Sequence, residues 1–133
     1  MILVVCIDEK GGTLFNRRRQ SQDQLLRLDL LREAGGRTIW MNGYSVRQFT
    51  DPPENIRVAE DFYRQAGEGE LCFFEDVDPV PFLERAETVI LYHWNRRYPA
   101  DRYFPQPLAG WSVERTEDFA GSSHECITKE ILV

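Results

Sequence analysis

Three short, mostly apolar runs constrain the fold of this chain more than any other feature. They are Ile2–Ile7, Leu71–Phe74 and Thr88–Trp94. A run without polar alternation is typical of a strand that is covered on both faces, as in a parallel or mixed sheet. The segment Asp78–Ala86 has the right length for a crossover helix between the second run and the third. We therefore expect the three runs to be neighbouring strands of one sheet.

The other segments predict helices between strands and then a final pair of strands. Ser21–Gln24 matches a capping box with Ser21 as N-cap, and it opens a helix that runs to about Ala34. Trp111–Arg115 and Glu125–Leu132 indicate an antiparallel pair that closes one edge of the sheet. This order predicts a single α/β domain over residues 1–133, with a twisted, mixed and mainly parallel sheet flanked by helices. Further segments are expected as a loop at 8–20, a strand at 38–41, a helix near 45–49, a strand at 56–58 and a helix at 59–66.

Composition and charge exclude several classes of protein. The chain has 133 residues, 42% of them hydrophobic, and a net charge of −6, which argues against binding a nucleic-acid backbone. No apolar run reaches membrane-spanning length and no basic segment precedes the first one, so we expect a cytoplasmic protein without a nucleic-acid or membrane partner. His93 and His124 are isolated in sequence, and no metal site is predicted. Cys6, Cys72 and Cys126 are expected to be reduced core residues.

An acidic turn stands where a nucleotide-binding protein would carry glycines. The strand ending at Phe74 is followed by Glu75, Asp76 and Asp78, and a helix opens on Pro79. Glycines at such a turn would let a pyrophosphate reach the backbone amides. We expect Asp76 or Asp78 to cap the helix instead. A divalent cation is the alternative partner for the carboxylates, but their spacing matches no calcium-binding loop.

Several short signatures in this chain resemble those of the dihydrofolate reductase family. Met1–Asp8 is similar to the family's first strand, and Arg37–Phe49 to a later strand and the helix after it. Asp101–Pro105 resembles the family's D-x-x-F-P signature, and Trp111–Val113 resembles the W-x-x-V that follows, here as W-x-V. The resemblance covers nearly the whole chain, and it implies a diverged and shortened member of this family. It also implies NADPH as cofactor and reduction of a pterin or folate-type substrate.

The catalytic position of the family carries over poorly to this sequence. The family holds the pterin ring with a carboxylate on its first helix, and that position falls here on Leu25 or Leu26. A leucine cannot hydrogen-bond the pterin or assist its protonation. Asp23 is the candidate replacement, and Asp29 is the alternative one turn further along the helix.

The cofactor positions implied by the resemblance are also replaced. The family's Met-Gly-Arg corresponds to Met41-Asn42-Gly43, so the arginine that pairs with the adenosine 2′-phosphate is missing. Gly43 and Ser45 are the remaining candidate contacts in this region. The family's glycine pair corresponds to Glu75-Asp76, and a carboxylate about 6 Å from a phosphate repels it by ~3 kcal/mol at an effective dielectric near 20. We therefore expect weak or absent NADPH binding.

The resemblance further implies an apolar substrate slot. Its candidate residues are Ile2, Val4, Leu26, Leu30, Phe74 and Tyr92. The same residues would serve equally as plain core, and Arg17–Arg19 would be either an anion contact or a solvated loop. Three functions therefore stay open: a working reductase, a non-catalytic module that binds a small molecule in the cleft, and an interaction or structural protein whose cleft is filled. The oligomeric state does not follow from the sequence.

Overall fold

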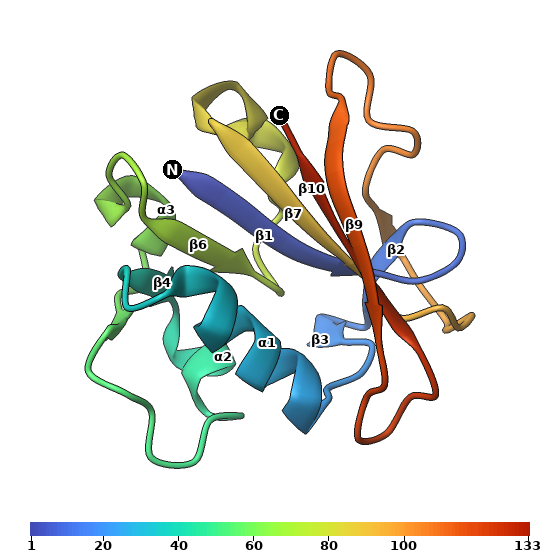
Figure 1. Cartoon of the computed structure of the whole chain (residues 1–133), viewed down its shortest axis with the longest axis horizontal. Helices are drawn as coiled ribbons and strands as arrows, with labels where there is room; N and C mark the ends of the chain where they lie inside the picture. The colour runs from blue at the N-terminus through green and yellow to red at the C-terminus, as the bar shows by residue number, and fades with distance from the viewer.

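The computed structural model describes all residues from 1 to 133 and has one large sheet at its centre (Figure 1). Seven strands form this sheet in the order β5-β4-β6-β1-β7-β10-β9. Their bounds are β1 Ile2–Ile7, β4 Ile39–Met41, β5 Ile56–Val58, β6 Leu71–Phe74, β7 Thr88–His93, β9 Val113–Phe119 and β10 Ile127–Leu132. The fold is therefore α/β with a mixed sheet, as the sequence predicts.

Strand β1 lies in the middle of the sheet and is parallel to both of its neighbours. Ile2 is paired with Leu71 of β6 on one side and with Thr88 of β7 on the other. The prediction that the three apolar runs share one sheet is confirmed, and β1 separates the other two. Strand β10 is antiparallel to β7, and β9 is antiparallel to β10 and forms the edge, so the predicted C-terminal pair is also confirmed.

The main helix, α1, spans Gln24–Ala34, and its N-cap is Asp23. The predicted cap at Ser21 is wrong, because the Asp23 carboxylate accepts hydrogen bonds from the amides of Leu25 and Leu26. The helix ends at Gly35, whose left-handed backbone (φ 57°) lets its amide reach the last carbonyls of the helix. The other helices are short: α2 Gly43–Val46, α3 Phe62–Gln65 and a 3₁₀ helix, η1, at Val80–Arg85.

Two apolar cores lie on the two faces of the large sheet. Helix α1 covers one face, where Leu26, Leu30 and Ala34 pack against side chains of β1, β6 and β7. On the opposite face, Phe62 of α3 and residues of η1 pack against the alternate side chains of the same strands. Coverage of both faces explains why the central strands are apolar without alternation. No helix of the protein is long and apolar enough to cross a membrane.

A second, small sheet lies near the C-terminal end of β1 (Figure 1). It has the order β3-β2-β8, with β2 Gly12–Phe15, β3 Arg18–Arg19 and β8 Arg102–Tyr103. Asn16 and Arg17 join β2 to β3 and both have positive φ, which is typical of a two-residue hairpin turn. The prediction of a loop from Asp8 to Gln20 is therefore wrong in this part of the chain.

Candidate functional site

The site lies at the edge of the sheet where the parallel strands β1, β4, β6 and β7 end. In α/β proteins, ligands bind beyond the carboxyl ends of the strands, where successive connections leave to opposite sides. Here β1 is such a point, because β6 and β7 lie on either side of it. The chain turns polar directly after these strands, at Asp8, Asn42 and Glu75. The β2–β3 hairpin adds further polar side chains at this edge.

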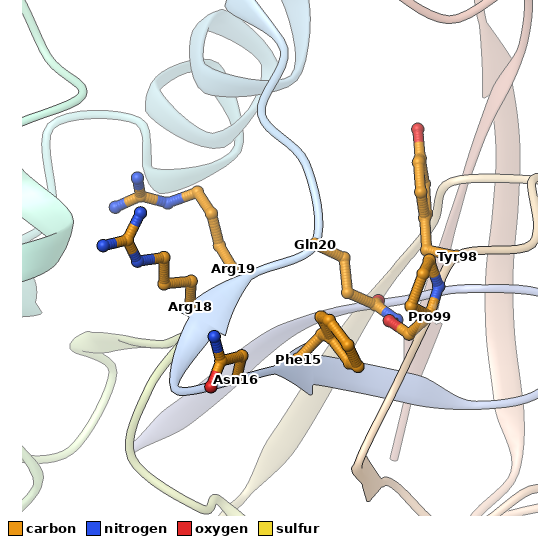
Figure 2. Close-up of a pocket in the computed structure, with 7 residues that line it drawn as sticks. All are labelled: Phe15, Asn16, Arg18, Arg19, Gln20, Tyr98 and Pro99. Atoms are coloured by element: carbon orange, nitrogen blue, oxygen red, sulfur yellow. The ribbon is translucent and has the colours of Figure 1, made fainter.

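A cavity of about 260 Å³ opens beside this hairpin (Figure 2). Figure 2 shows Arg18 and Arg19 at one end of the cavity and Gln20, Tyr98 and Pro99 at the other. The complete lining is Phe15, Asn16, Arg18, Arg19, Gln20, Tyr98 and Pro99. No carboxylate lines the cavity, although the net charge of the protein is −6. The cavity is therefore locally positive.

Gln20 is held in place at the wall of the cavity. Its Nε2 donates hydrogen bonds to Asp8 Oδ2 at 2.8 Å and to the carbonyl of Pro99 at 3.2 Å. Its Oε1 is buried and has no hydrogen-bond partner. Gly12 makes this arrangement possible, because a Cβ there would lie 2.6 Å from Asp8 Oδ2 and 2.8 Å from Gln20 Nε2. This oxygen is closed off from the cavity, so the two bonds of Nε2 fix the position of Gln20 but leave no open acceptor for a ligand.

A narrower recess of about 10 Å³ shares Arg19 and Gln20 with the larger cavity. Ser21, Cys6, Phe74 and Glu75 are among the other residues that line it. Its volume is about that of one water-sized group. The recess is therefore too small for a pterin or a nicotinamide ring.

Arg19 neutralises the first carboxylate of the acidic turn. Its Nε and Nη2 donate to Glu75 at 3.0 and 3.2 Å, and Gln48 Nε2 donates to the same carboxylate at 2.9 Å. The Arg19 guanidinium also lies 4.2 Å from the centre of the Tyr44 ring. The Glu75 side chain is only 7% exposed. Of the three consecutive arginines, Arg19 is thus part of the site as the partner of Glu75.

The other two carboxylates of the turn also have partners within the chain. Asp76 accepts a hydrogen bond from Asn42 Nδ2 at 2.8 Å, and Arg102 donates to the Asp76 carbonyl at 2.7 Å. Asp78 accepts a hydrogen bond from the amide of Val80 at 3.1 Å. The N-cap of the 3₁₀ helix η1 is Pro79, which makes no side-chain capping bond, so the prediction that Asp76 or Asp78 caps this helix is wrong; Asp78 bonds to the first helical amide from one position further out.

The two remaining cofactor candidates lie in the short helix α2. The amide of Gly43 donates a hydrogen bond to the carboxylate of Glu60 at 2.9 Å, so this amide already has a partner within the protein. Ser45 is buried, and its hydroxyl has no hydrogen-bond partner. Neither residue lines a cavity. Together with Glu75 and Asp76, these positions form a contiguous polar region that is closed by its own side chains.

Asp23, the candidate acid, is buried and fully engaged. Besides its capping bonds, it accepts hydrogen bonds from the amides of Ser122 and Ser123 at 3.0 and 2.8 Å and from His124 Nδ1 at 3.0 Å. Burial by itself would raise the pKa of Asp23, but these hydrogen bonds outweigh it and hold the pKa well below the usual value. Asp23 therefore stays ionised at neutral pH and lacks a proton to donate to a substrate.

Asp29 is engaged on the other side of α1. It accepts a hydrogen bond from the hydroxyl of Tyr92 at 2.7 Å and pairs with Lys129 Nζ at 2.9 Å. Burial and the nearby Asp29 charge raise the pKa of Tyr92, which keeps the hydroxyl protonated. Lys129 also contacts Glu33 at 2.8 Å and Glu117 at 3.2 Å. This network joins α1 to β7, β9 and β10.

The predicted substrate residues are buried in the two cores. Ile2, Val4, Leu26, Leu30 and Tyr92 all belong to the core under α1, and none of them lines a cavity. Phe74 belongs to the core on the opposite face and reaches only the narrow recess. The structure therefore brings five of the six residues together, in a space that their own side chains fill.

His124, like Gln20 and Tyr98, belongs to the site and was not predicted from the sequence. Its Nδ1 bonds to Asp23, and its Nε2 lies 2.8 Å from the Tyr98 hydroxyl and 3.2 Å from Ser21 Oγ. The ring stacks on Trp94 with 4.6 Å between the ring centres. The polar run of Ser122, Ser123 and His124 just before a strand was the available signal. Its partner Ser21 lies 103 residues away in sequence, so spacing could not reveal the pair.

The cysteines and the acidic groups give no sign of redox or metal chemistry. Burial raises the pKa of Cys6 well above its usual value and that of Cys72 to about 12, so neither is a reactive thiolate. Cys126 is exposed, and its prediction as a core residue is wrong. No group of three or more His, Cys, Asp or Glu side chains is placed to hold a metal ion.

Comparison of the chain with models of known protein families gives no match, and comparison with curated proteins gives no similar sequence. The α/β fold with its seven-stranded mixed sheet is shown by the structure. The resemblance to the dihydrofolate reductase family stays a prediction from the sequence.

Proposed function

We propose that this protein is a diverged dihydrofolate-reductase-like domain that binds a small polar molecule and does not use NADPH to reduce it. The sequence signatures support the family, and a mixed sheet flanked by helices agrees with the fold that they imply. The replaced catalytic and cofactor positions oppose reductase chemistry. The cavity of about 260 Å³ beside the β2–β3 hairpin offers a place for a ligand.

The contact between Arg19 and Glu75 carries this proposal. The resemblance puts the pyrophosphate of a dinucleotide against this turn, and Arg19 is the cation that pairs with the first carboxylate of the turn. A phosphate that took Arg19 for itself would leave Glu75 as an unpaired carboxylate at 7% exposure. Removing one partner of a buried ion pair costs about 3–5 kcal/mol. The turn therefore favours the internal pair over the cofactor.

The filled substrate slot supports the same conclusion. A reductase needs room for a ring beside its acid group, and Asp23 and Asp29 are each buried against partners of this chain. Five of the predicted slot residues pack on one another without a cavity between them. A ligand would have to open this core, and burial of those side chains opposes that opening.

The cavity beside the hairpin suits a small organic anion. Arg18 lines it and makes no ion pair with any carboxylate of the protein. Phe15 also lines the cavity and is 47% exposed. A ligand with an anionic group for Arg18 and a flat apolar part for Phe15 would satisfy both.

A titration with 4-hydroxybenzoate tests this proposal, because the compound carries a carboxylate for Arg18 and an aromatic ring for Phe15. Calorimetry should show binding at about 1 mM, the affinity expected of so small a ligand. Arg18→Ala should weaken it about tenfold, through loss of a charge-assisted contact. Arg17→Ala is the matched control, since Arg17 is adjacent and exposed but does not line the cavity. Equal loss in both variants, or no binding at 10-fold higher concentration, would contradict the assignment of the cavity.

A role in protein interaction is the second candidate, and it has its own observation. Leu25 and Leu28 on the outer side of α1 are 39% and 46% exposed. Leu28 also lines a groove of about 300 Å³ together with Leu31 and Phe49. An apolar helix face of this kind is typical of a contact surface. Sedimentation of the wild-type chain and of Leu28→Glu tests self-association, which the substitution should abolish.

A further inference from the structure

Three side chains from distant parts of the chain meet in an order typical of nucleophilic catalysis. Ser21 Oγ lies 3.2 Å from His124 Nε2, and His124 Nδ1 lies 3.0 Å from Asp23 Oδ2. We propose that Ser21, His124 and Asp23 form a catalytic triad that hydrolyses short-chain acyl esters. Such triads are recognised by geometry and not by the order of their residues in sequence. This inference rests on the proposed function, because the leaving group would occupy the cavity described there.

Asp23 determines which nitrogen of the ring is the base. An ionised carboxylate only accepts hydrogen bonds, so the proton of a neutral His124 lies on Nδ1 and is donated to Asp23. Nε2 is then an acceptor that faces the Ser21 hydroxyl. The carboxylate is itself fixed by the amides of Ser122 and Ser123, and the ring by its stack on Trp94. The base therefore has one orientation and one tautomer.

Tyr98 competes with Ser21 for the base in the resting protein. Its hydroxyl lies 2.8 Å from His124 Nε2 and 3.4 Å from Ser21 Oγ. Tyr98 also lines the cavity, so it connects the triad with the proposed binding site. Because it holds the same lone pair, Tyr98 should lower the reactivity of Ser21 until a substrate separates the two hydroxyls.

The surroundings of Ser21 offer donors for the oxyanion of an acyl-transfer reaction. The amides of Ser21 and Gln22 donate no hydrogen bond to any group of the protein. The amide of the nucleophile and that of its neighbour are groups that serve as an oxyanion hole in unrelated hydrolases. Neither amide therefore has to give up a protein partner to bind an oxyanion.

The two connected spaces define the class of substrate. Ser21 lines the recess of about 10 Å³, which has room for one water-sized group and so limits the acyl side chain to a single methyl group, as in acetyl. Arg19 and Gln20 also line the 260 Å³ cavity, where the leaving group would lie beside Arg18. The substrate class is thus an acetyl-type ester of a small alcohol or phenol that carries a negative charge.

Water is the only co-reactant that the reaction needs. Ser21 Oγ bonds to the acyl carbon and its proton passes to His124 Nε2. The bond from the acyl carbon to the leaving oxygen then breaks, and that oxygen takes the proton from Nε2. Water gives a proton to Nε2 and attacks the acyl group of Ser21, and the proton returns to Oγ as the carboxylic acid leaves. No oxidant or reductant is required.

Active-site labelling tests the triad on the full-length protein. A fluorophosphonate reagent should add once to the intact chain, and peptide mapping should locate the adduct on Ser21. Hydrolysis of 4-acetoxybenzoate should proceed above the buffer rate, and Ser21→Ala should reduce it at least about 100-fold. Ser112→Ala is the matched control. Ser112 is exposed, and its backbone hydrogen bonds are with Val133 and not with any residue of the triad. It should retain both labelling and hydrolysis.

A second variant tests the triad without replacing Asp23 or His124, which are both buried and hydrogen-bonded. Tyr98→Phe preserves the ring and removes the competing hydroxyl, so it should speed labelling of Ser21 about fivefold. An adduct on Tyr98, or no adduct on a folded protein, would overturn the triad. If 4-hydroxybenzoate still binds in that case, the triad alone fails and the binding proposal stands. If Ser21 is labelled but 4-hydroxybenzoate does not bind, the cavity assignment fails and the triad stands.

Discussion

Arg19 reaches from the β2–β3 hairpin to the turn after β6 and holds the Glu75 carboxylate with hydrogen bonds of 3.0 and 3.2 Å. The pair connects the small sheet to the large one at the edge where the parallel strands end. It also explains how the turn tolerates three carboxylates close together, because the charge of Glu75 is neutralised while Asp76 and Asp78 remain. The charge that would repel a phosphate is balanced from within the chain.

Breaking this pair from the arginine side should be costly. Arg19→Met leaves Glu75 buried without a counter-charge, and we expect a loss of about 3 kcal/mol in the free energy of unfolding. Glu75→Gln in the same chain should recover part of that loss, because a neutral amide needs no counter-charge. Urea denaturation of the two single variants and the double variant measures the coupling. A coupling energy below about 0.5 kcal/mol would show that the pair is a surface contact of no structural importance.

Asp23 should make the stability of the protein depend on acid pH. Its pKa in the folded state lies below that of an unfolded chain, which is about 3.9, so the unfolded state takes up the proton first as the pH falls. The stabilisation is therefore complete above about pH 4 and is lost as the pH falls toward the folded-state pKa. Asp23→Asn should flatten this slope and cost about 1–2 kcal/mol at pH 7, because a neutral amide forms weaker hydrogen bonds with Ser122, Ser123 and His124 than the ionised carboxylate does.

The control for the acid slope is Asp51→Asn, since Asp51 is exposed and its positive φ suits asparagine. Thermal unfolding between pH 2 and pH 7 gives the dependence of stability on pH for the wild type, Asp23→Asn and Asp51→Asn. A wild-type slope identical to that of Asp23→Asn would contradict the role given to Asp23.

Gly121 should be intolerant of any side chain. A Cβ at this position would lie 2.5 Å from Asp23 Oδ2 and 2.9 Å from the His124 carbonyl. Gly121→Ala must push the loop away from Asp23, and we expect a loss of about 1–3 kcal/mol in the free energy of unfolding. Gly67→Ala is the matched control, because its Cβ would meet Glu70 Oε1 at an ordinary 3.5 Å. Equal unfolding temperatures for the two variants would refute the tight packing of this loop on Asp23.

The large sheet could be predicted because its signal is local. The apolar run at Ile2–Ile7 needs cover on both faces, and that requirement alone indicates a central strand. The β2–β3 hairpin was missed because its turn residues, Asn16 and Arg17, lack the glycine that usually marks such a turn. Asp23 was missed as the cap because Ser21 and Gln24 match a local template, while the amides that favour Asp23 come from Ser122 and Ser123.

The candidate site was less predictable than the fold, because its contacts are distant in sequence. The acidic turn could be recognised from Glu75 and Asp76 alone, but its partner Arg19 is 56 residues away. The apolar slot was predicted as a set of residues, and only the packing of Leu26 and Leu30 reveals that it is filled. Side chains that meet only through the tertiary fold leave no periodicity for a sequence pattern to detect.

The closed turn should also resist simple restoration of its glycines. Replacing Glu75 and Asp76 by glycine removes two carboxylates and frees Arg19, so some affinity for NADPH should appear. The gain should be partial, because Gly43 lacks a guanidinium and its amide is held by Glu60. It should also shrink as salt is added, since the restored attraction is electrostatic.

Calorimetric titration of the unmodified protein with NADPH tests the central claim most directly. If Arg19 and Glu75 close the turn, the titration should show no saturable heat below about 1 mM, which corresponds to less than about 4 kcal/mol of binding free energy. A dissociation constant in the micromolar range would contradict the claim, and it would favour the alternative that the protein is a working reductase.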